Sequence, residues 1–163
     1  MESIRRVSYD YTADDAGQVI TGRKGEEYIV AYWDGSAPAS IAKGQPVVIG
    51  YGVDGSDNIG PKVAAITTSA VPQRPAVALD ALTTAGWYAF QVTGDAYGLV
   101  TGSADISAAG KLLELLNGAT SFTYDGAART VGSAAISGEA YTTANAALKA
   151  IYLFGEPVQI AAT

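Results

Sequence analysis

The chain of 163 residues carries a net charge of −6 and contains neither cysteine nor histidine. These absences exclude disulfides, zinc sites built from the usual ligands, cysteine nucleophiles and histidine general bases. The acidic balance, without any basic stripe, argues against nucleic acid and anionic membranes as partners. Charged residues make up only 16% of the sequence, against about 25% in typical soluble domains, so we expect partner proteins to cover much of the surface.

The N-terminal region, residues 1–39, is predicted to hold an extended arm and the first strands. Residues 4–11 alternate in character, which is typical of an arm or an edge strand. The start of the chain has no apolar segment of a secretory signal, and no stretch approaches the roughly 20 apolar residues of a membrane span. We therefore expect a soluble protein that is made in a cytoplasm.

Short β-branched and aromatic runs, separated by glycine turns, follow along the rest of the chain. They predict strands at residues 27–33, 45–51, 63–67, 75–80, 87–94, 96–102, 111–116, 148–154 and 158–160. Residues 54–62 are expected to form a loop. The Asp-Gly pair at 125–126 predicts a tight hairpin between residues 121–126 and 128–134.

Two segments carry weak helix signals. The alanines of residues 143–149 are compatible with a short helix, whereas residues 107–116 favour a turn and a strand because Gly110 costs about 1 kcal/mol in a helix interior. We predict a mainly β protein: a compact β-sandwich or barrel-like domain with Gly-rich turns, at most one or two short helices and an extended N-terminal arm. Residues 40–163 are expected to form this domain from two related β units, at about 40–95 and 106–156.

The evidence for two units is a repeated motif, ALDALTTAG at residues 78–86 and SGEAYTTAN at residues 137–145. Each copy follows a glycine turn that enters an apolar strand, SIAKGQPVV at 40–48 and ISAAGKLLE at 106–114. Because the order is the same in both halves, the sequence indicates a duplicated β unit. The motif residues are Asp80, Thr83, Thr84 and Gly86 in the first copy and Glu139, Thr142, Thr143 and Asn145 in the second.

The motif has two interpretations. One is a pair of related binding sites with Asp80 and Glu139 as their acids. The other is a structural turn, in which threonine hydroxyls and the acid bond nearby backbone amides and Gly86 or Asn145 supplies a positive φ. We favour the turn, because neither copy provides a nucleophile together with a base.

Other motifs give little support for a catalytic or metal site. Residues 54–58, DGSDN, resemble half of a calcium loop, but Ile59 and Ala65 stand where the full loop needs Gly and Glu. Spacing singles out no glycosidase pair among the 16 acids, and neither a P-loop nor a GxSxG motif is present. We therefore expect no enzyme activity, no cofactor and no metal.

Aromatic residues gather on two of the predicted strands. They are Tyr28, Tyr32 and Trp33 on one strand and Trp87, Tyr88 and Phe90 on the other. Rings on an exposed face would stack on sugars, whereas rings in a core or a subunit seam would serve packing, for which Tyr and Trp are enriched. We favour packing.

Three segments, AKGQPVVIG, RPAVALDALTTAGWYAFQVTG and SAAGKLLEL, resemble the small head decoration, or cement, proteins of tailed bacteriophages. The shared pattern is a Gly-x-x-Val entry strand, a Val-Ala-Leu-acid-Ala segment, a Thr-Ala-Gly turn and a Val-rich strand. The resemblance covers roughly residues 40–154. The region 1–39 has no counterpart in it, and Asn145 stands where the second turn would have Gly.

The resemblance implies a non-enzymatic virion structural protein that sits on the outer face of an icosahedral head after assembly in the host cytoplasm. Such proteins commonly act as homotrimers at three-fold positions and tie neighbouring major capsid protein subunits together against the pressure of the genome. A protein that binds only the mature lattice stabilises it by mass action, and many bridging copies add avidity. The resemblance supplies no catalytic residues.

The N-terminal arm is the candidate capsid contact, because an exposed strand can pair with the edge of a partner sheet. An ordinary first strand of the domain is an equal alternative. The residues concerned are Ile4, Arg5, Arg6, Val7, Tyr9 and Tyr11.

Two other function classes remain. A carbohydrate- or cell-surface-binding β module of a phage appendage would use tyrosine and tryptophan rings on one exposed face. An enzyme, the third hypothesis, would need an acid pair in a cleft.

Overall fold

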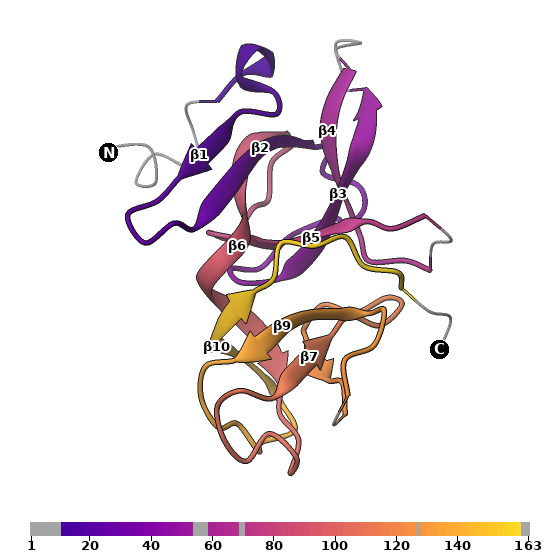
Figure 1. The fold of residues 1–163 in the computed structure, drawn as a ribbon. Helices are drawn as coiled ribbons and strands as arrows, with labels where there is room; N and C mark the ends of the chain where they lie inside the picture. Colours follow the sequence, from indigo (N-terminus) through magenta and orange to yellow (C-terminus); the bar gives the residue numbers. More distant parts are fainter. Residues whose placement is uncertain (1–10, 54–58, 69–70, 127, 161–163) are drawn as a thin grey trace.

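The computed structural model describes residues 11–53, 59–68, 71–126 and 128–160. These residues contain one short 3-10 turn (Ala13–Asp15) and strands that hydrogen bonds join into one network (Figure 1). The strands are β1 (Val19–Thr21), β2 (Glu27–Trp33), β3 (Pro46–Val53), β4 (Ile59–Ala64), β5 (Arg74–Ala78), β6 (Gly86–Thr101), β7 (Leu112–Glu114), β8 (Thr123–Tyr124), β9 (Ser133–Ser137) and β10 (Ala146–Leu153). The prediction of a compact, mainly β fold is confirmed. Within the described ranges, no helix is long and apolar enough to cross a membrane.

Five strands close into a first barrel. β2 pairs antiparallel with β6 and parallel with β4, where Tyr32 lies opposite Lys62. β4 then pairs with β3, β3 with β5 and β5 with β6, all antiparallel. Because β6 also pairs with β2, the ring of strands is closed. β1 lies outside the ring and pairs with β2. The predicted region 1–39 therefore contains β2, which supplies one wall of this barrel.

A second barrel repeats the same strand order. The C-terminal half of β6 takes the place that β2 has in the first barrel: it pairs antiparallel with β10 and, through a parallel bridge from Val100 to Phe122, with the residue before β8. β8 pairs with β7, β7 with β9 and β9 with β10, all antiparallel. The two barrels are thus equivalent in topology, and β6 belongs to both.

β6 passes from one barrel to the other at Gly94. This glycine has a φ of 84°, and a Cβ at the position would lie 2.9 Å from the Cβ of Glu26. The amide of the buried Gln91 donates hydrogen bonds to the carbonyl oxygens of Thr93 at 3.0 Å and Asp95 at 2.7 Å. These hydrogen bonds reach the residues on both sides of Gly94, and a typical hydrogen bond contributes about 0.5–1.5 kcal/mol, so Gln91 stabilises the bend.

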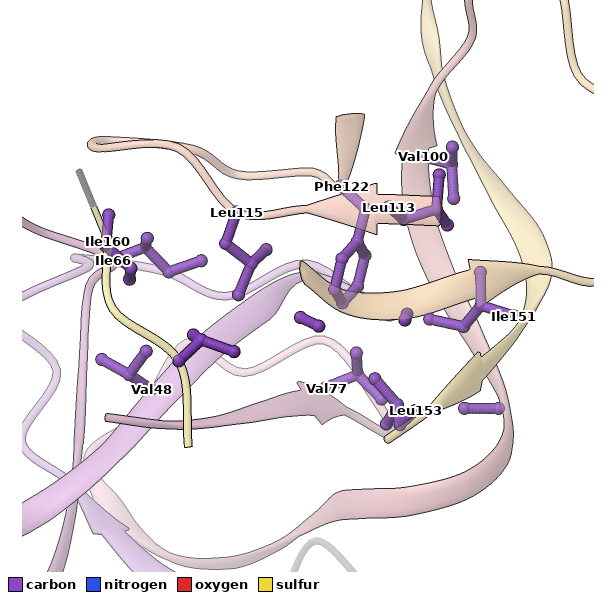
Figure 2. Packing of buried hydrophobic residues seen from close by; sticks show 14 of the residues in the cluster. Val48, Ile66, Val77, Val100, Leu113, Leu115, Phe122, Ile151, Leu153 and Ile160 are labelled. Atoms are coloured by element: carbon purple, nitrogen blue, oxygen red, sulfur yellow. The ribbon is translucent and has the colours of Figure 1, made fainter. Parts of the chain in front are cut away.

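The core of the second barrel extends onto strands of the first barrel. The first barrel encloses the fully buried rings of Trp33 and Phe90. The core of the second barrel surrounds Phe122 and reaches beyond its own strands (Figure 2). It includes residues of β3, β5 and the C-terminal segment, namely Val48, Val77, Val158 and Ile160. The barrels therefore pack as one body.

The expected hairpin at 121–134 is wrong. β8 pairs with β7, and β9 pairs with β7 and β10, so the two segments are not partners. Gly126 does adopt the left-handed conformation, with a φ of 95°. However, the Asp125 carboxylate accepts hydrogen bonds from the Thr130 and Ser133 hydroxyls, which holds a longer loop in place of a tight turn.

Three further expectations differ from the structure. The loop expected at 54–62 ends earlier, because β4 begins at Ile59; Pro61 is tolerated where β4 is paired only with β3. The segment 143–149 contains no helix, since β10 begins at Ala146 and pairing with β6 overrides the helix preference of alanine. The strands expected at 87–94 and 96–102 are one continuous β6.

Candidate functional site

The residues of the predicted N-terminal arm, Ile4 to Tyr9, lie outside the described residues, as does the DGSDN segment. Tyr11 is half-buried, and its backbone forms a bridge to Trp87 at the start of β6. The turn that follows is closed by a capping box, in which the Asp15 carboxylate accepts the Thr12 N–H at 2.8 Å. The arm residue nearest the domain is therefore in contact with the first barrel.

The two copies of the repeated motif occupy equivalent places, between β5 and β6 and between β9 and β10. In the first copy the Gly44 N–H donates to the Ala78 carbonyl at 2.8 Å, and in the second the Gly110 N–H donates to the Ser137 carbonyl at 2.7 Å. Both glycines have positive φ values, 76° and 84°. The motif and the glycine turn before it thus form one hydrogen-bonded unit in each barrel.

The acids of the motif accept hydrogen bonds from backbone N–H groups. Asp80 accepts the Ala81 N–H at 2.8 Å, and Glu139 accepts the Ala150 N–H at 3.2 Å and lies 3.8 Å from the Nζ of Lys149. Among the described residues, neither acid contacts a nucleophile or a second carboxylate. This geometry supports the turn interpretation over a pair of binding sites.

The other motif residues lie on the surface, with one correction to their expected role. The exposed threonines are Thr83, Thr84, Thr142 and Thr143. Carbonyl oxygens of the turns accept tyrosine hydroxyls: Thr84 from Tyr88 and Asn145 from Tyr141, both at 2.6 Å. Gly86 does not supply a positive φ; it begins β6, and the left-handed residue of the unit is Gly44.

The aromatic residues of the two predicted strands are packed. Trp33 and Phe90 are fully buried and Tyr28 is buried. Tyr32 contacts Trp87 at 5.4 Å with ring planes tilted by 48°, and Trp33 donates its indole N–H to the Pro38 carbonyl at 2.9 Å. These rings form no coplanar exposed face, so they do not support the sugar-binding interpretation.

The exposed rings are ones that the sequence interpretation missed. Tyr97 on β6 is 66% exposed, Tyr152 on β10 is 47% exposed, and Leu148 beside them is 40% exposed. Their strand positions share the outer face of the second barrel, because Tyr97 lies opposite Ala150 and Tyr152 opposite Asp95. One signal was available in the sequence: residues 95–101 carry apolar side chains on both faces of the strand, so some of them had to lie outside the core.

A groove of about 490 Å³ lies on this face of the second barrel. Asp95 and Tyr97 of β6 and Ala150 and Tyr152 of β10 line it, together with the end of β9. Its other side is formed by the turn between β1 and β2. That turn contributes Lys24 and Glu26.

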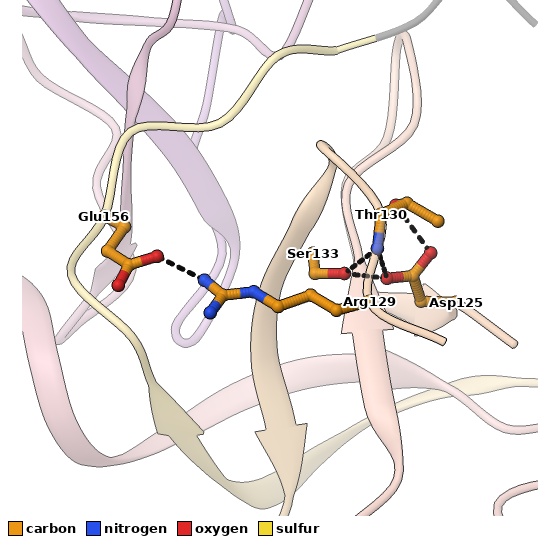
Figure 3. Close-up of polar contacts among 5 residues, drawn as sticks. All are labelled: Asp125, Arg129, Thr130, Ser133 and Glu156. Carbon is orange, nitrogen blue, oxygen red and sulfur yellow. Dashed lines mark hydrogen bonds and ion pairs between the residues drawn. The ribbon is translucent and has the colours of Figure 1, made fainter. Parts of the chain in front are cut away.

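A polar cluster braces the loop between β8 and β9 (Figure 3). Asp125 binds Thr130 and Ser133, and Arg129 pairs with Glu156 of the C-terminal segment. Ser133 is buried, and its hydroxyl donates a hydrogen bond to the Asp125 carboxylate. The cluster holds the loop against the second barrel and the C-terminal segment.

The pKa values of two carboxyl groups are shifted in opposite directions. Hydrogen bonds from Ser36 and the nearby Lys62, 3.0 Å away, hold the pKa of Asp34 well below its usual range. Burial, together with the neighbouring Asp125, raises the pKa of Glu114. Neither carboxyl group belongs to a cluster that could hold a metal ion, because the described residues contain no group of three or more potential ligands.

No protein-family model and no curated protein matches this chain. The assignment of a role therefore depends on the residues and surfaces described above.

Proposed function

We propose that the chain is a non-enzymatic structural protein of a tailed-phage virion, which decorates the outer face of the head and stabilises it by bridging major capsid protein subunits. The resemblance of residues 40–154 to head decoration proteins supports this proposal. The structural observation that carries it is that one packed body presents two separate apolar surfaces.

The first surface, which we call the β3–β4 tip, consists of Tyr51 of β3 and Ile59 of β4. Tyr51 is 84% exposed and Ile59 is 78% exposed, and the hairpin projects from the first barrel, away from the second (Figure 1). Large apolar side chains that project into solvent are typical of contact sites. The tip would insert into a neighbouring subunit of the shell.

The second surface is the outer face of β6 and β10, with Tyr97, Leu148 and Tyr152. It belongs to the second barrel, whereas the hairpin tip belongs to the first. A bridging protein needs two such contacts, and it must transmit load between them. That connection is provided by Val48 and Val77, which pack in the core of the second barrel, and by the Gln91-braced bend of β6.

The low fraction of charged residues fits a protein whose surface is covered after assembly. Homotrimers on the shell would bury more of it, and many copies would add avidity. The six aromatic residues of the predicted strands do not support the sugar-binding alternative, because their rings are packed and the paired rings are tilted against each other.

The experiment uses heads of the encoding phage, purified without this protein. Added protein should bind at a saturable copy number and raise the temperature at which heads release DNA. Tyr51→Ala with Ile59→Ala should weaken binding at least tenfold while leaving the melting temperature of the free protein within about 2 °C. Heads that bind no protein, or that bind it without any gain in stability, would contradict the proposal.

A further inference from the structure

The groove on the second barrel has a chemistry that suits a basic side chain. Tyr152 lies directly opposite Asp95 across β6 and β10, and Tyr97 lies opposite Ala150. The two tyrosines are therefore diagonal neighbours, about 7–8 Å apart along the sheet, with the small Ala150 between them. In the described part of the chain neither ring packs against another aromatic ring, and both rings are partly exposed to solvent.

The charges around the groove are unbalanced. The charged side chains that line the groove are the carboxylates of Glu26 and Asp95 and the ammonium group of Lys24. Within the described ranges Lys24 forms no ion pair, and the Asp95 carboxylate forms neither an ion pair nor a hydrogen bond. Glu26 is held in place because its carboxylate accepts the Lys24 N–H at 2.8 Å. The groove thus combines exposed rings with a net negative charge.

The second barrel uses this combination twice to hold its own basic residues. The Nζ of Lys149 lies 4.5 Å from the centre of the Tyr141 ring and 3.8 Å from Glu139. Arg129 lies 4.5 Å over the Phe154 ring and pairs with a second carboxylate, that of Glu156. In both cases a ring and a carboxylate share one cation, an arrangement favoured by the electrostatics of the ring face.

We propose that the groove binds an arginine or lysine side chain of the major capsid protein. The cation would lie between Tyr97 and Tyr152, with Asp95 as its principal carboxylate and Glu26 as the second. This inference rests on the proposed decoration role, to which it adds the chemistry of the partner. The charge complementarity favours a cationic side chain over a neutral sugar, which would gain nothing from the net charge of the groove.

The first experiment needs no phage heads. The probe is the tripeptide acetyl-Gly-Arg-Gly-amide, titrated into the ¹⁵N-labelled full chain and followed by NMR. The matched ligand replaces arginine with citrulline, which has nearly the same shape without the charge. We expect shifts at the amides of Asp95, Tyr97 and Tyr152, binding at least tenfold weaker for the citrulline peptide, and further weakening by salt.

Three variants sharpen this titration. Asp95→Asn should weaken the arginine peptide at least fivefold. Lys24→Ala, which removes the competing positive charge, should strengthen it. Tyr51→Ala changes a more exposed tyrosine on the other barrel and should have no effect. Equal binding of the two peptides, or shifts in the groove with maltohexaose and not with the arginine peptide, would overturn the inference.

The second experiment separates the inference from the decoration role. Asp95→Asn and Tyr152→Ala are compared with the wild type for binding to undecorated heads, with Val131→Ala, another exposed residue of the second barrel, as the control. Both groove variants should bind at least fivefold more weakly, and the control should not. If all variants bind like the wild type, the groove proposal fails and the decoration role stands. If the wild type binds no heads, the decoration role fails, and the peptide titration still decides whether the groove binds a cation.

Discussion

The two barrels have the same strand order, but different side chains lie beside the parallel pairing that closes each ring. In the first, β2 meets β4 beside a partly exposed ion pair between Asp34 and Lys62. In the second, β6 meets the residue before β8 through backbone hydrogen bonds, and beside them the hydroxyls of Thr101 and Ser121 lie 2.7 Å apart. The two barrels have the hydrogen-bonded framework in common, while the side chains at equivalent places differ.

The barrels also differ in what they present to solvent. The first has long strands β3 and β4 that extend beyond its core, and its glycine turn at Gly44 is covered by β10. The second has short strands β7 and β8, an open turn at Gly110 and a groove with exposed tyrosines. The comparison teaches that one framework can carry two different contact surfaces.

The largest expected effects come from the cores. Phe90→Ala in the first barrel and Phe122→Ala in the second should each reduce the free energy of unfolding by about 3–5 kcal/mol, because both rings are fully buried. Both tryptophans belong to the first barrel, so their fluorescence reports on it, while circular dichroism reports on the whole chain. Since Val48 and Val77 of the first barrel pack in the core that contains Phe122, Phe122→Ala should shift both denaturation curves together. A fluorescence transition that stays at the wild-type midpoint would show that the barrels unfold independently.

The two glycine turns offer a matched pair. Gly44→Ala and Gly110→Ala both place a Cβ on a left-handed residue, which costs about 1–2 kcal/mol. At Gly44 the new atom would also overlap Leu148 and lie 3.1 Å from the Tyr97 carbonyl, whereas at Gly110 it meets open space. We expect Gly44→Ala to cost about 2–4 kcal/mol in total and Gly110→Ala no more than about 2. Equal losses in urea denaturation would contradict this packing difference.

The bend of β6 should depend on Gln91. Gln91→Met keeps the side-chain volume but removes the donor to the carbonyls of Thr93 and Asp95, so we expect a loss of about 1–3 kcal/mol in the free energy of unfolding. The control is Gln18→Met, at an exposed position, which should change stability by less than about 0.5 kcal/mol. If the two variants unfold at the same denaturant concentration, Gln91 does not stabilise the bend.

The smallest effects concern pH and have opposite signs in the two barrels. The pKa of Asp34 is lowered, so this group contributes stability above its usual value near 3.8 that is lost as the pH falls further. The pKa of Glu114 is raised above its usual value near 4.5, so stability is lost as the pH rises through the raised pKa.

Melting temperatures between pH 3 and pH 8 test both signs. Asp34→Asn should lower the melting temperature at neutral pH and flatten its fall in acid. Glu114→Gln should keep or raise the melting temperature at neutral pH and flatten its decline above pH 4.5. Profiles that run parallel to the wild type would contradict both assignments.

The local elements of the fold were predictable because their signals are local. The run at 27–33 is β-branched and aromatic and ends at Asp34-Gly35, and it forms β2 with those bounds. The repeated motif identified the two equivalent turns because side chains and glycines recur at fixed spacing. Strand pairing was beyond reach, since β2 and β6 meet across more than 50 residues of intervening chain.

The candidate surfaces were harder to predict than the strands. Gly94-Asp95 has the composition of a turn, but pairing with β2 up to Thr93 and with β10 from Gly94 makes it part of one continuous strand. Tyr97 stands between Ala96 and Gly98, and Tyr152 lies within an apolar run, so neither stands out in the sequence. The pairing of β6 with β10 brings them to one face. The strands rich in rings were conspicuous, yet their rings are packed.

The central claim is that one body bridges shell subunits through two surfaces, and a cryo-electron microscopy reconstruction of heads decorated with this protein tests it most directly. The account predicts density for both barrels on the outer face, with the β3–β4 tip against one subunit and the β6–β10 face against another subunit. Heads without added density, or a protein attached through a single surface with the other facing solvent, would contradict it.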